Sequence, residues 1–324
     1  MEPRHASLGD LPMESWMSGT PPDLWDVPLH QLAIPGSHNA ITYCLDRDRR
    51  SPIDVTQPDL LKKLDRYMKP LVRHFLYKWA VTQDNCVWQQ LNCGVRYCDL
   101  RIGRKPGDDS GDLYFYHGLY TTLTVETVLA EICSWLDAHP KEVVVLSFSH
   151  FLDVSDQLHM QLLCKIRNIF ASKITPRMKT PTLRKLWSLG HQVIVSYEHA
   201  AMAASHADLW PSIPYWWANK CKVEALIDDF ELRKTRGRPG RFFVTGINLT
   251  VDLKYICTHL NQRLKDMATS AEPALLAWLE RQSPGDRASS INIVAGDFAA
   301  DGRFTRTVVA LNDKLLHFTQ PSNV

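Results

Sequence analysis

The chain has 324 residues, 45% of them hydrophobic, so it is long enough to bury a large core. Its 37 lysines and arginines nearly balance its 35 aspartates and glutamates, and the formal net charge is +2. This balance argues against a nucleic-acid-binding protein, whose footprint is a marked basic excess.

Cysteine usage and hydropathy indicate the cellular compartment in which the protein is expected. The eight cysteines form no C-x-x-C pair, which favours reduced, packed thiols over a disulfide framework or a zinc site. The first residues lack the apolar core of a signal peptide, and no apolar stretch approaches the ~20 residues that cross a bilayer. We therefore expect a cytoplasmic protein.

Composition divides the chain into two parts. Residues 1–24 are rich in proline, serine, glycine and acidic residues, and we expect a flexible lead-in. Over residues 25–324 short apolar runs alternate with amphipathic helical patterns, without a repeat or a low-complexity linker. The simplest interpretation is one folded domain over 25–324.

The middle and the C-terminal half of the chain alternate between helical and strand patterns. Apolar side chains recur at helical spacing over 125–136. The run EVVVLSF at 142–148 has no polar alternation, which is typical of a strand covered on both faces in a parallel sheet. The predicted elements are helices at 125–136 and 158–170 and strands at 142–148, 192–197, 242–247 and 291–295.

This alternation of strand and helix is the pattern of an α/β protein. An α/β barrel and a doubly wound sheet both produce it. The periodicity therefore leaves both architectures open.

Charged side chains occur within the predicted strand VRYCDLRI at 95–102. Alternation puts Asp99 and Arg101 on one face of this strand and an apolar set on the other. Burying both charges is costly unless they are paired or face a polar cavity. Because active sites of α/β barrels lie at the C-terminal strand ends, this face is a candidate site.

Three further strand exits carry a polar side chain. They are His38 after QLAIP (31–35), His117 in DLYFYHG (112–118) and Asp297 in INIVAGD (291–297). Taken singly, each residue has a plainer interpretation, as a hydrogen-bonded structural histidine or a helix N-cap. Asp99 and Arg101 alone would suggest an ion pair within one strand. Polar residues at four separate strand exits in one chain favour a single shared site.

Several segments resemble, in order and spacing, the signatures of the phosphatidylinositol-specific phospholipase C X-domain family. They are IPGSHN (34–39), RYCDLRIG (96–103), YFYHG (114–118) and VAGDF (294–298), with KWAVTQ (78–83) and PYWWANK (214–220) similar to the compact animal members. The resemblance spans residues 25–317. It implies the fold of that family, a distorted, incomplete TIM-like α/β barrel in a single domain.

The resemblance also implies a reaction. The inositol 2-hydroxyl would attack the phosphorus of a phosphoinositide and give a cyclic inositol phosphate and diacylglycerol. His38 would be the general base and His117 the general acid, which suits imidazoles because their pKa lies near neutrality. The supporting roles would be orientation of His38 by Asp297, support of His117 by Asp99 and phosphate binding by Arg101.

The same resemblance implies neither a metal nor a cofactor. Calcium-dependent members of the family carry an acidic ligand at the position of Arg101, and a guanidinium cannot ligate calcium. We therefore expect a metal-independent enzyme.

Substrate contacts are expected from Asn39, Tyr197, Asn219 and Lys222. Asn39 stands where bacterial members of the family have aspartate, and an amide cannot relay a proton as a carboxyl group can. The substrate-binding lysine of those members has no evident counterpart here, because Ser149 and His150 occupy that region. The first departure favours a slower enzyme, and the second leaves the contacts to the substrate head group open.

A lipid substrate requires contact with a membrane. Trp216, Trp217 and the basic segment 233–241 (RKTRGRPGR) are candidate contacts, with barrel packing and a solvated loop as the plainer interpretations. We expect a monomer that contacts a phosphoinositide membrane transiently and binds no nucleic acid.

Two other functions compete with an active phospholipase C. One is a non-catalytic module that binds lipid or inositol phosphate on the same barrel, which the departures at Asn39 and at the lysine position favour. The other is a metal-dependent glycerophosphodiesterase, which Arg101 and the few acidic residues at the strand exits disfavour.

Overall fold

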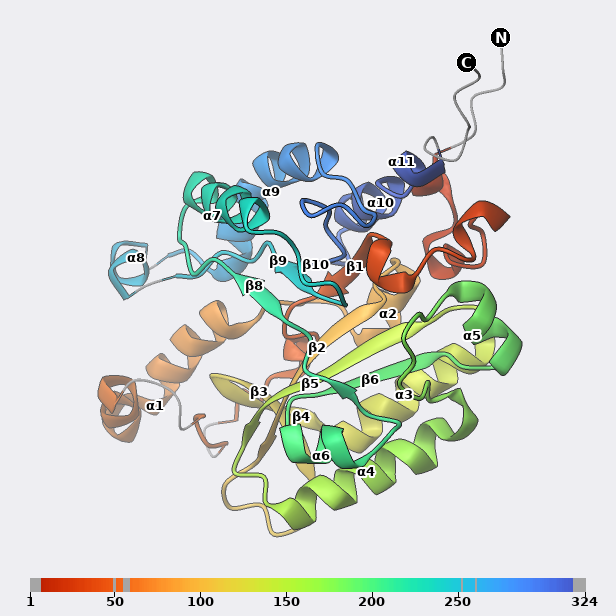
Figure 1. The fold of residues 1–324 in the computed structure, drawn as a ribbon. Coiled ribbons are helices and arrows are strands. Elements are labelled where there is room, and N and C mark those ends of the chain that lie inside the picture. The colour runs from red at the N-terminus through yellow and green to blue at the C-terminus, as the bar shows by residue number, and fades with distance from the viewer. Residues whose placement is uncertain (1–6, 49–50, 55–58, 252, 260, 317–324) are drawn as a thin grey trace, which may run out of the picture.

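The computed structural model describes residues 7–48, 51–54, 59–251, 253–259 and 261–316 (Figure 1). Within these residues ten strands form one sheet, in which eight follow the order β7-β6-β5-β2-β1-β10-β9-β8 and β3 and β4 extend from β2 as a hairpin. The strands are β1 (Ile34–Ser37), β2 (Tyr97–Arg104), β3 (Leu113–His117), β4 (Leu119–Thr124), β5 (Val144–Leu152), β6 (Val193–Tyr197), β7 (Trp210–Pro211), β8 (Tyr215–Trp217), β9 (Val244–Gly246) and β10 (Ile293–Gly296).

Helices surround this sheet, and Figure 1 shows α3 and α4 on one side of it and α7, α9 and α10 on the other. The helices are α1 (Asp59–Ala80), α2 (Val87–Asn92), α3 (Val125–Ala138), α4 (Asp156–Phe170), α5 (Leu183–Leu189), α6 (Ala200–Ser205), α7 (Val223–Thr235), α8 (Leu253–Thr258), α9 (Leu264–Glu280), α10 (Arg303–Ala310) and α11 (Asp313–Leu316). No described helix combines the length and the apolar character needed to cross a membrane.

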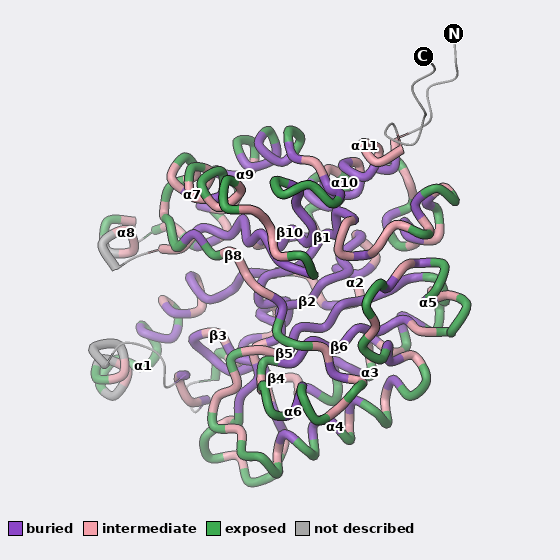
Figure 2. Tube along the Cα trace, viewed as in Figure 1, coloured by how far each residue is buried: buried purple, intermediate pink, exposed green. Residues whose placement is uncertain are grey.

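The eight strands of the main path pair in parallel and curl into an incomplete barrel, which confirms the predicted fold class. Alternate side chains of each strand enter two separate cores, and Figure 2 shows the strands buried between exposed helical turns. Tyr97 and Ile194 pack inside the curl, whereas Cys98 and Val195 pack under the helices. The continuous apolar runs therefore mark strands covered on both faces.

The prediction of α3 is also confirmed. Its N-cap Thr124 accepts a hydrogen bond from the backbone N–H of Thr127, which satisfies one free donor of the first turn. Its buried residues are the predicted apolar set, namely Val125, Val128, Leu129, Ile132, Trp135 and Leu136.

The predicted flexible lead-in over residues 1–24 is wrong for the part that the structure describes. Residues 7–24 contain three short 3₁₀ helices and bury Trp16 and Met17 almost completely. This segment packs into the same core as the inner faces of the strands. Residues 1–6 lie outside the described residues.

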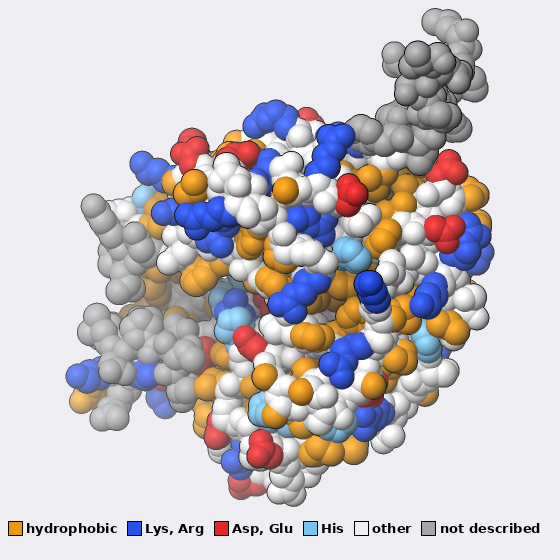
Figure 3. Space-filling view, viewed as in Figure 1, with side chains coloured by type: hydrophobic (Ala, Val, Ile, Leu, Met, Phe, Trp, Pro, Cys, Tyr) orange, Lys and Arg blue, Asp and Glu red, His pale blue; other side chains and the backbone are white. Residues whose placement is uncertain are grey.

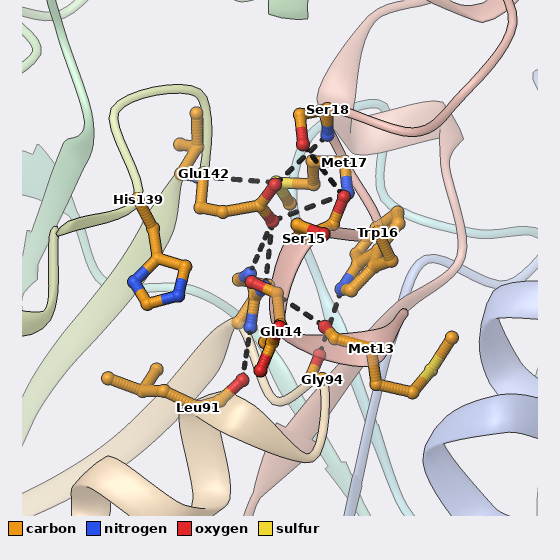
Figure 4. Close-up of polar contacts among 12 residues, drawn as sticks. Met13, Glu14, Ser15, Trp16, Met17, Ser18, Leu91, Gly94, His139 and Glu142 are labelled. Carbon is orange, nitrogen blue, oxygen red and sulfur yellow. Dashed lines mark hydrogen bonds and ion pairs between the residues drawn. The ribbon is translucent and has the colours of Figure 1, made fainter. Parts of the chain in front are cut away.

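A buried ion pair holds the segment in place. Arg96 donates to Glu142 at 2.7 Å and to the carbonyl oxygens of Met13 and Glu14. The Glu142 carboxylate also accepts hydrogen bonds from the backbone N–H groups of Met17 and Ser18 (Figure 4). The prediction of a flexible segment rested on its composition alone. Composition does not show the distant charged partners that order the segment.

Glu142→Ala should lower the free energy of unfolding by about 3–5 kcal/mol, because it leaves the Arg96 guanidinium buried without a counter-ion. Urea denaturation followed by circular dichroism measures the change. The control is Arg184→Ala, which breaks the exposed pair with Asp26 and should cost about 1 kcal/mol or less. Equal losses in both variants would contradict this account.

Candidate active site

The site lies where β1 and β10 end beside the first residues of β2, and strand register assembles it. Ser37 of β1 pairs with Gly296 of β10 on one side and with Cys98 of β2 on the other. One residue further along each strand lie His38, Asp297 and Asp99. Three of the predicted site residues are therefore neighbours because the parallel register sets them side by side, although Asp99 lies within β2 and not at its end.

His38 has a carboxylate on one ring nitrogen and donors at the other. Its ring is nearly buried, and Nδ1 lies 2.8 Å from Oδ1 of Asp297. Nε2 lies 3.0 Å from Nδ2 of Asn39 and 3.4 Å from a terminal nitrogen of Arg101. An N–H on Nδ1 donating to Asp297 leaves the Nε2 lone pair facing the site, which is the tautomer required of a base.

Asn39 adopts a left-handed backbone conformation with φ of 44°, which asparagine tolerates better than most residues. Its backbone N–H donates to Oδ2 of Asp99 at 3.2 Å. Its side-chain Oδ1 is buried without a hydrogen-bond partner among the described residues, which is an unfavourable state for an amide oxygen. Asn39 thus links His38 to Asp99 and retains an unused acceptor.

Asp99 is buried and ionised. Burial alone would raise the pKa of Asp99, but the positive charge of Arg101, the electrostatic interaction with His38 and the Asn39 N–H hold it below its ordinary value. Nε of Arg101 lies 3.8 Å from Oδ2 of Asp99, and the Ser149 hydroxyl donates to Oδ1 at 3.2 Å. Asp99 therefore pairs with Arg101 by charge alone, since Nε of Arg101 has no hydrogen-bond partner among the described residues, and Ser149 supports the carboxylate.

His117 lies in the site, but on a different kind of strand from the one predicted. Its strand β3 runs antiparallel to β2, with Phe115 opposite Ile102, so that His117 is not at a parallel strand exit. The hairpin nevertheless brings the ring to the site, where the His38 and His117 ring centroids are 6.1 Å apart and the rings are inclined at 73°. The two imidazoles therefore face each other.

The predicted support of His117 by Asp99 also needs correction. Nδ1 of His117 lies 2.7 Å from the carbonyl oxygen of Ala80, at the end of α1. A carbonyl oxygen only accepts, so Nδ1 carries the hydrogen and Nε2 remains available in the neutral ring. Burial, followed by the positive charge of Arg101 and the electrostatic interaction with His38, lowers the pKa of His117 to about 3.

The segment after Ala80 braces the site, a role that the sequence did not reveal. The Thr82 hydroxyl donates to the carbonyl oxygen of His38 at 3.0 Å. The Gln83 side-chain amide donates to the carbonyls of His38 and Gly296 and accepts from the N–H of Ala299. These contacts tie the loop after β1 to the loop after β10. The only sequence signal for them was the similarity of KWAVTQ to relatives.

Tyr215 is a second residue that the sequence analysis missed. Its ring centroid lies 6.3 Å from that of His38, and its hydroxyl donates to Oδ1 of Asn248 at 2.9 Å. Burial raises the pKa of Tyr215 well above its ordinary value, so the phenol stays protonated. A Cβ atom on Gly246 would lie 2.1 Å from the Tyr215 ring, so the ring occupies this place only because residue 246 is glycine.

The expected substrate contact of Tyr197 is wrong. Its side chain is fully buried and packs under the helices, and its hydroxyl is hydrogen-bonded to Nδ1 of His159 at 2.7 Å. Strand alternation points Tyr197 away from the inside of the curl. Asn219 and Lys222 are exposed in the loop between β8 and α7, which follows the C-terminal end of a barrel strand.

The candidate membrane contacts are largely engaged within the protein. Trp216 packs against Phe243, and Trp217 is 49% exposed with its indole N–H on the Thr250 hydroxyl. Several cations of 233–241 have internal partners, since Arg233 and Lys234 pair with acidic residues of α7 and Arg238 donates to backbone carbonyls. Packing is thus the main role of Trp216.

The donor set does not resemble a metal site. Asp297 is hydrogen-bonded to His38 and Asp99 is paired with Arg101. Among the described residues no group of three or more histidine, cysteine, aspartate and glutamate side chains is arranged to hold a metal ion.

His117 should titrate far below its ordinary pKa of 6.5, near 3, and Arg101→Gln should raise that pKa because it removes one of the lowering charges. Histidine NMR signals followed against pH measure this. Arg104→Gln, an exposed change at the end of the same strand, is the control and should leave the His117 titration in place. An ordinary pKa for His117 in the unliganded protein would contradict the geometry.

Comparison with known proteins places this geometry in context. The model of the phosphatidylinositol-specific phospholipase C X domain matches residues 71–199. The chain is 47% identical over 303 residues to PI-PLC X domain-containing protein 1 of Homo sapiens, covering 94% of this chain and 93% of the relative. It is 35% identical over 309 residues to PI-PLC X domain-containing protein 3 of Danio rerio, covering 94% of each.

Solved bacterial structures share the fold. A phosphatidylinositol-specific phospholipase C from Staphylococcus aureus aligns with a TM-score of 0.64 and 14% identity over 94% of this chain and 99% of its own. The enzyme of that name from Listeria monocytogenes aligns with a TM-score of 0.61 and 18% identity over 93% and 99%. At this identity the likeness extends to the barrel architecture alone.

Proposed function

This chain belongs to the family of PI-PLC X domain-containing proteins, and we propose that it is a phosphoric diester hydrolase. In this proposal it cleaves phosphatidylinositol to diacylglycerol and a cyclic inositol phosphate, as a monomer in transient contact with a membrane. The observation that carries the proposal is the pair of imidazoles, 6.1 Å apart, with an arginine beside them. This arrangement suits a phosphodiester that must lose a proton on one side and gain one on the other.

His38 is the proposed base. Asp297 holds Nδ1 at 2.8 Å, which fixes the tautomer and stabilises the imidazolium that forms when Nε2 takes the proton of the inositol 2-hydroxyl. The oxygen then attacks the phosphorus of the same molecule. Because nucleophile and phosphorus belong to one substrate, the enzyme contributes orientation and proton removal.

His117 is the proposed acid that protonates the departing diacylglycerol oxygen. A pKa of about 3 leaves it neutral at pH 7 in the unliganded site. One cause of that low pKa is the positive charge of Arg101, and a bound phosphodiester anion offsets it. Substrate binding should therefore raise the pKa of His117 and charge it when it is needed.

Arg101 is the proposed phosphate ligand. Its guanidinium lies beside His38 and is held by Asp99, so the donors are oriented before substrate arrives. The charge that a metal would supply to the phosphate oxygens comes here from a side chain. We therefore propose metal-independent turnover.

One observation favours a non-catalytic binding module as the second candidate. The Asn39 amide lies 3.0 Å from Nε2 of His38, so it donates to the lone pair that the base must use. The substrate hydroxyl has to displace this donor before it can transfer its proton. A module that only binds inositol phosphates would not need that step.

Turnover of phosphatidylinositol in mixed micelles tests the proposal. His38→Ala and His117→Ala should each reduce kcat by about a hundredfold or more, because each removes one proton-transfer group. The wild type should be equally active with and without EDTA. The control is His191→Ala, which removes a histidine bonded to the Ser172 carbonyl and should keep full activity.

Two results would contradict this proposal. Wild-type protein that binds inositol phosphate but does not turn over the lipid would establish the binding module instead. Turnover that EDTA abolishes would contradict the role given to Arg101.

A further inference from the structure

A second cavity lies at the opposite end of the barrel from the two histidines. Its volume is about 450 Å³, within the range of small-molecule sites. Its lining residues lie mostly where strands begin: His30 precedes β1, Ile213 precedes β8, Phe242 precedes β9 and Ile194 is the second residue of β6. The phosphodiester site, in contrast, lies where strands end.

The cavity exists because the barrel does not close. In the described sheet, β7 pairs with β6 and β8 pairs with β9, and these two strands are the ends of the strand order. The lining includes Trp210 and Pro211 of β7 together with the segment that leads into β8. The cavity therefore opens at the seam between the two terminal strands.

The floor of the cavity is apolar. Ile194 is fully buried, and Ile213 and Phe242 are 9% and 5% exposed. All three belong to the core inside the curled sheet, and Trp210 packs edge-on to Phe242 with ring centroids 5.9 Å apart. A ligand on this floor would contact the barrel core directly through the seam.

The rim of the cavity is cationic. Arg177, Lys179 and Arg241 line it and are exposed, and the lining includes no aspartate or glutamate. Burial and the charge of Arg238 lower the pKa of the fourth basic residue, His30, so it adds no charge at neutral pH. Within the described part of the chain neither Lys179 nor Arg241 forms an ion pair, unlike Arg233 and Lys234 nearby in sequence. Figure 3 shows lysine and arginine side chains around hydrophobic ones on the face between β6 and β8.

We propose that this pocket binds a single-chain anionic amphiphile of the fatty-acid class. The acyl chain would lie on the floor at Ile213 and Phe242, above the fully buried Ile194, where it leaves water. The carboxylate would be held by Lys179 and Arg241 through charge-assisted hydrogen bonds. A small anion would leave the floor unused, and a neutral lipid would leave the cations unpaired.

Isothermal titration calorimetry with three probes tests the proposal. Decanoate should bind, 1-decanol should bind about tenfold more weakly because it lacks the charge, and butyrate should show no heat because it lacks the chain. Addition of myo-inositol 1-phosphate should leave the decanoate affinity unchanged, since the phosphodiester site is at the other end of the barrel. If decanoate does not bind, the fatty-acid proposal fails, and the proposed phospholipase activity is unaffected.

Substitutions distinguish the contribution of the rim cations to binding from that of the apolar floor. Lys179→Glu and Arg241→Glu should each raise the decanoate Kd by about tenfold and leave 1-decanol binding almost unchanged. Met178→Ser, a partly buried lining residue, should weaken both ligands. The charge control is Arg236→Glu, an exposed arginine outside the lining, and it should bind decanoate as the wild type does.

Thermal unfolding of each variant shows that it is folded. Equal affinity of the wild type for decanoate and 1-decanol, or an equal loss in the Arg236→Glu control, would overturn the proposal. Binding of phosphatidylserine vesicles without binding of monomeric decanoate would also overturn it, because it would indicate a membrane surface instead of a pocket.

Discussion

The position of β1 between β10 and β2 is the constraint on which the site depends. The register that pairs Ser37 with Gly296 and Cys98 also sets His38 beside Asp297 and Asp99. A Cβ atom on Gly36 would lie 2.8 Å from the Tyr97 ring, so glycine is needed for this close approach of β1 to β2. A slip of one residue would turn every side chain of β1 to the other face.

The charges around this register favour an anion between the histidines. Arg101 and the two imidazoles supply positive or potentially positive groups, whereas Asp99 and Asp297 are each engaged with one of them. Burial is the largest cause of the low pKa of His117, and the positive charge of Arg101 adds to it. An anion at this place would offset the electrostatic part of that lowering. In the proposed mechanism the same field would bind the phosphate and raise the pKa of the acid.

Sequence patterns predicted those parts that follow from local periodicity. Period-two alternation and the convergence of parallel strands were enough to predict that four residues lie together, namely His38, Asp99, Arg101 and Asp297. They failed for His117, since alternation does not distinguish a parallel strand from an antiparallel hairpin. Tyr197 was misplaced because it faces the helices, which the strand boundaries alone did not show.

Long-range polar contacts were the other part that sequence could not provide. The partner of His117 is the backbone carbonyl of Ala80, and a backbone partner cannot be predicted from residue type because every residue has one. The N-terminal segment appeared disordered by composition, whereas the Arg96–Glu142 pair fixes it from residues far along the chain. Such partners become visible only once the fold has brought them together.

The central claim is that the two imidazoles transfer protons to and from one phosphodiester whose own 2-hydroxyl is the nucleophile. The most direct measurement is ³¹P NMR of the products formed from phosphatidylinositol and from its 2-deoxy analogue. The cyclic phosphate should be the first product from phosphatidylinositol, and the 2-deoxy lipid should not be cleaved. Cleavage of both lipids at similar rates, or a non-cyclic phosphate as the first product, would contradict it.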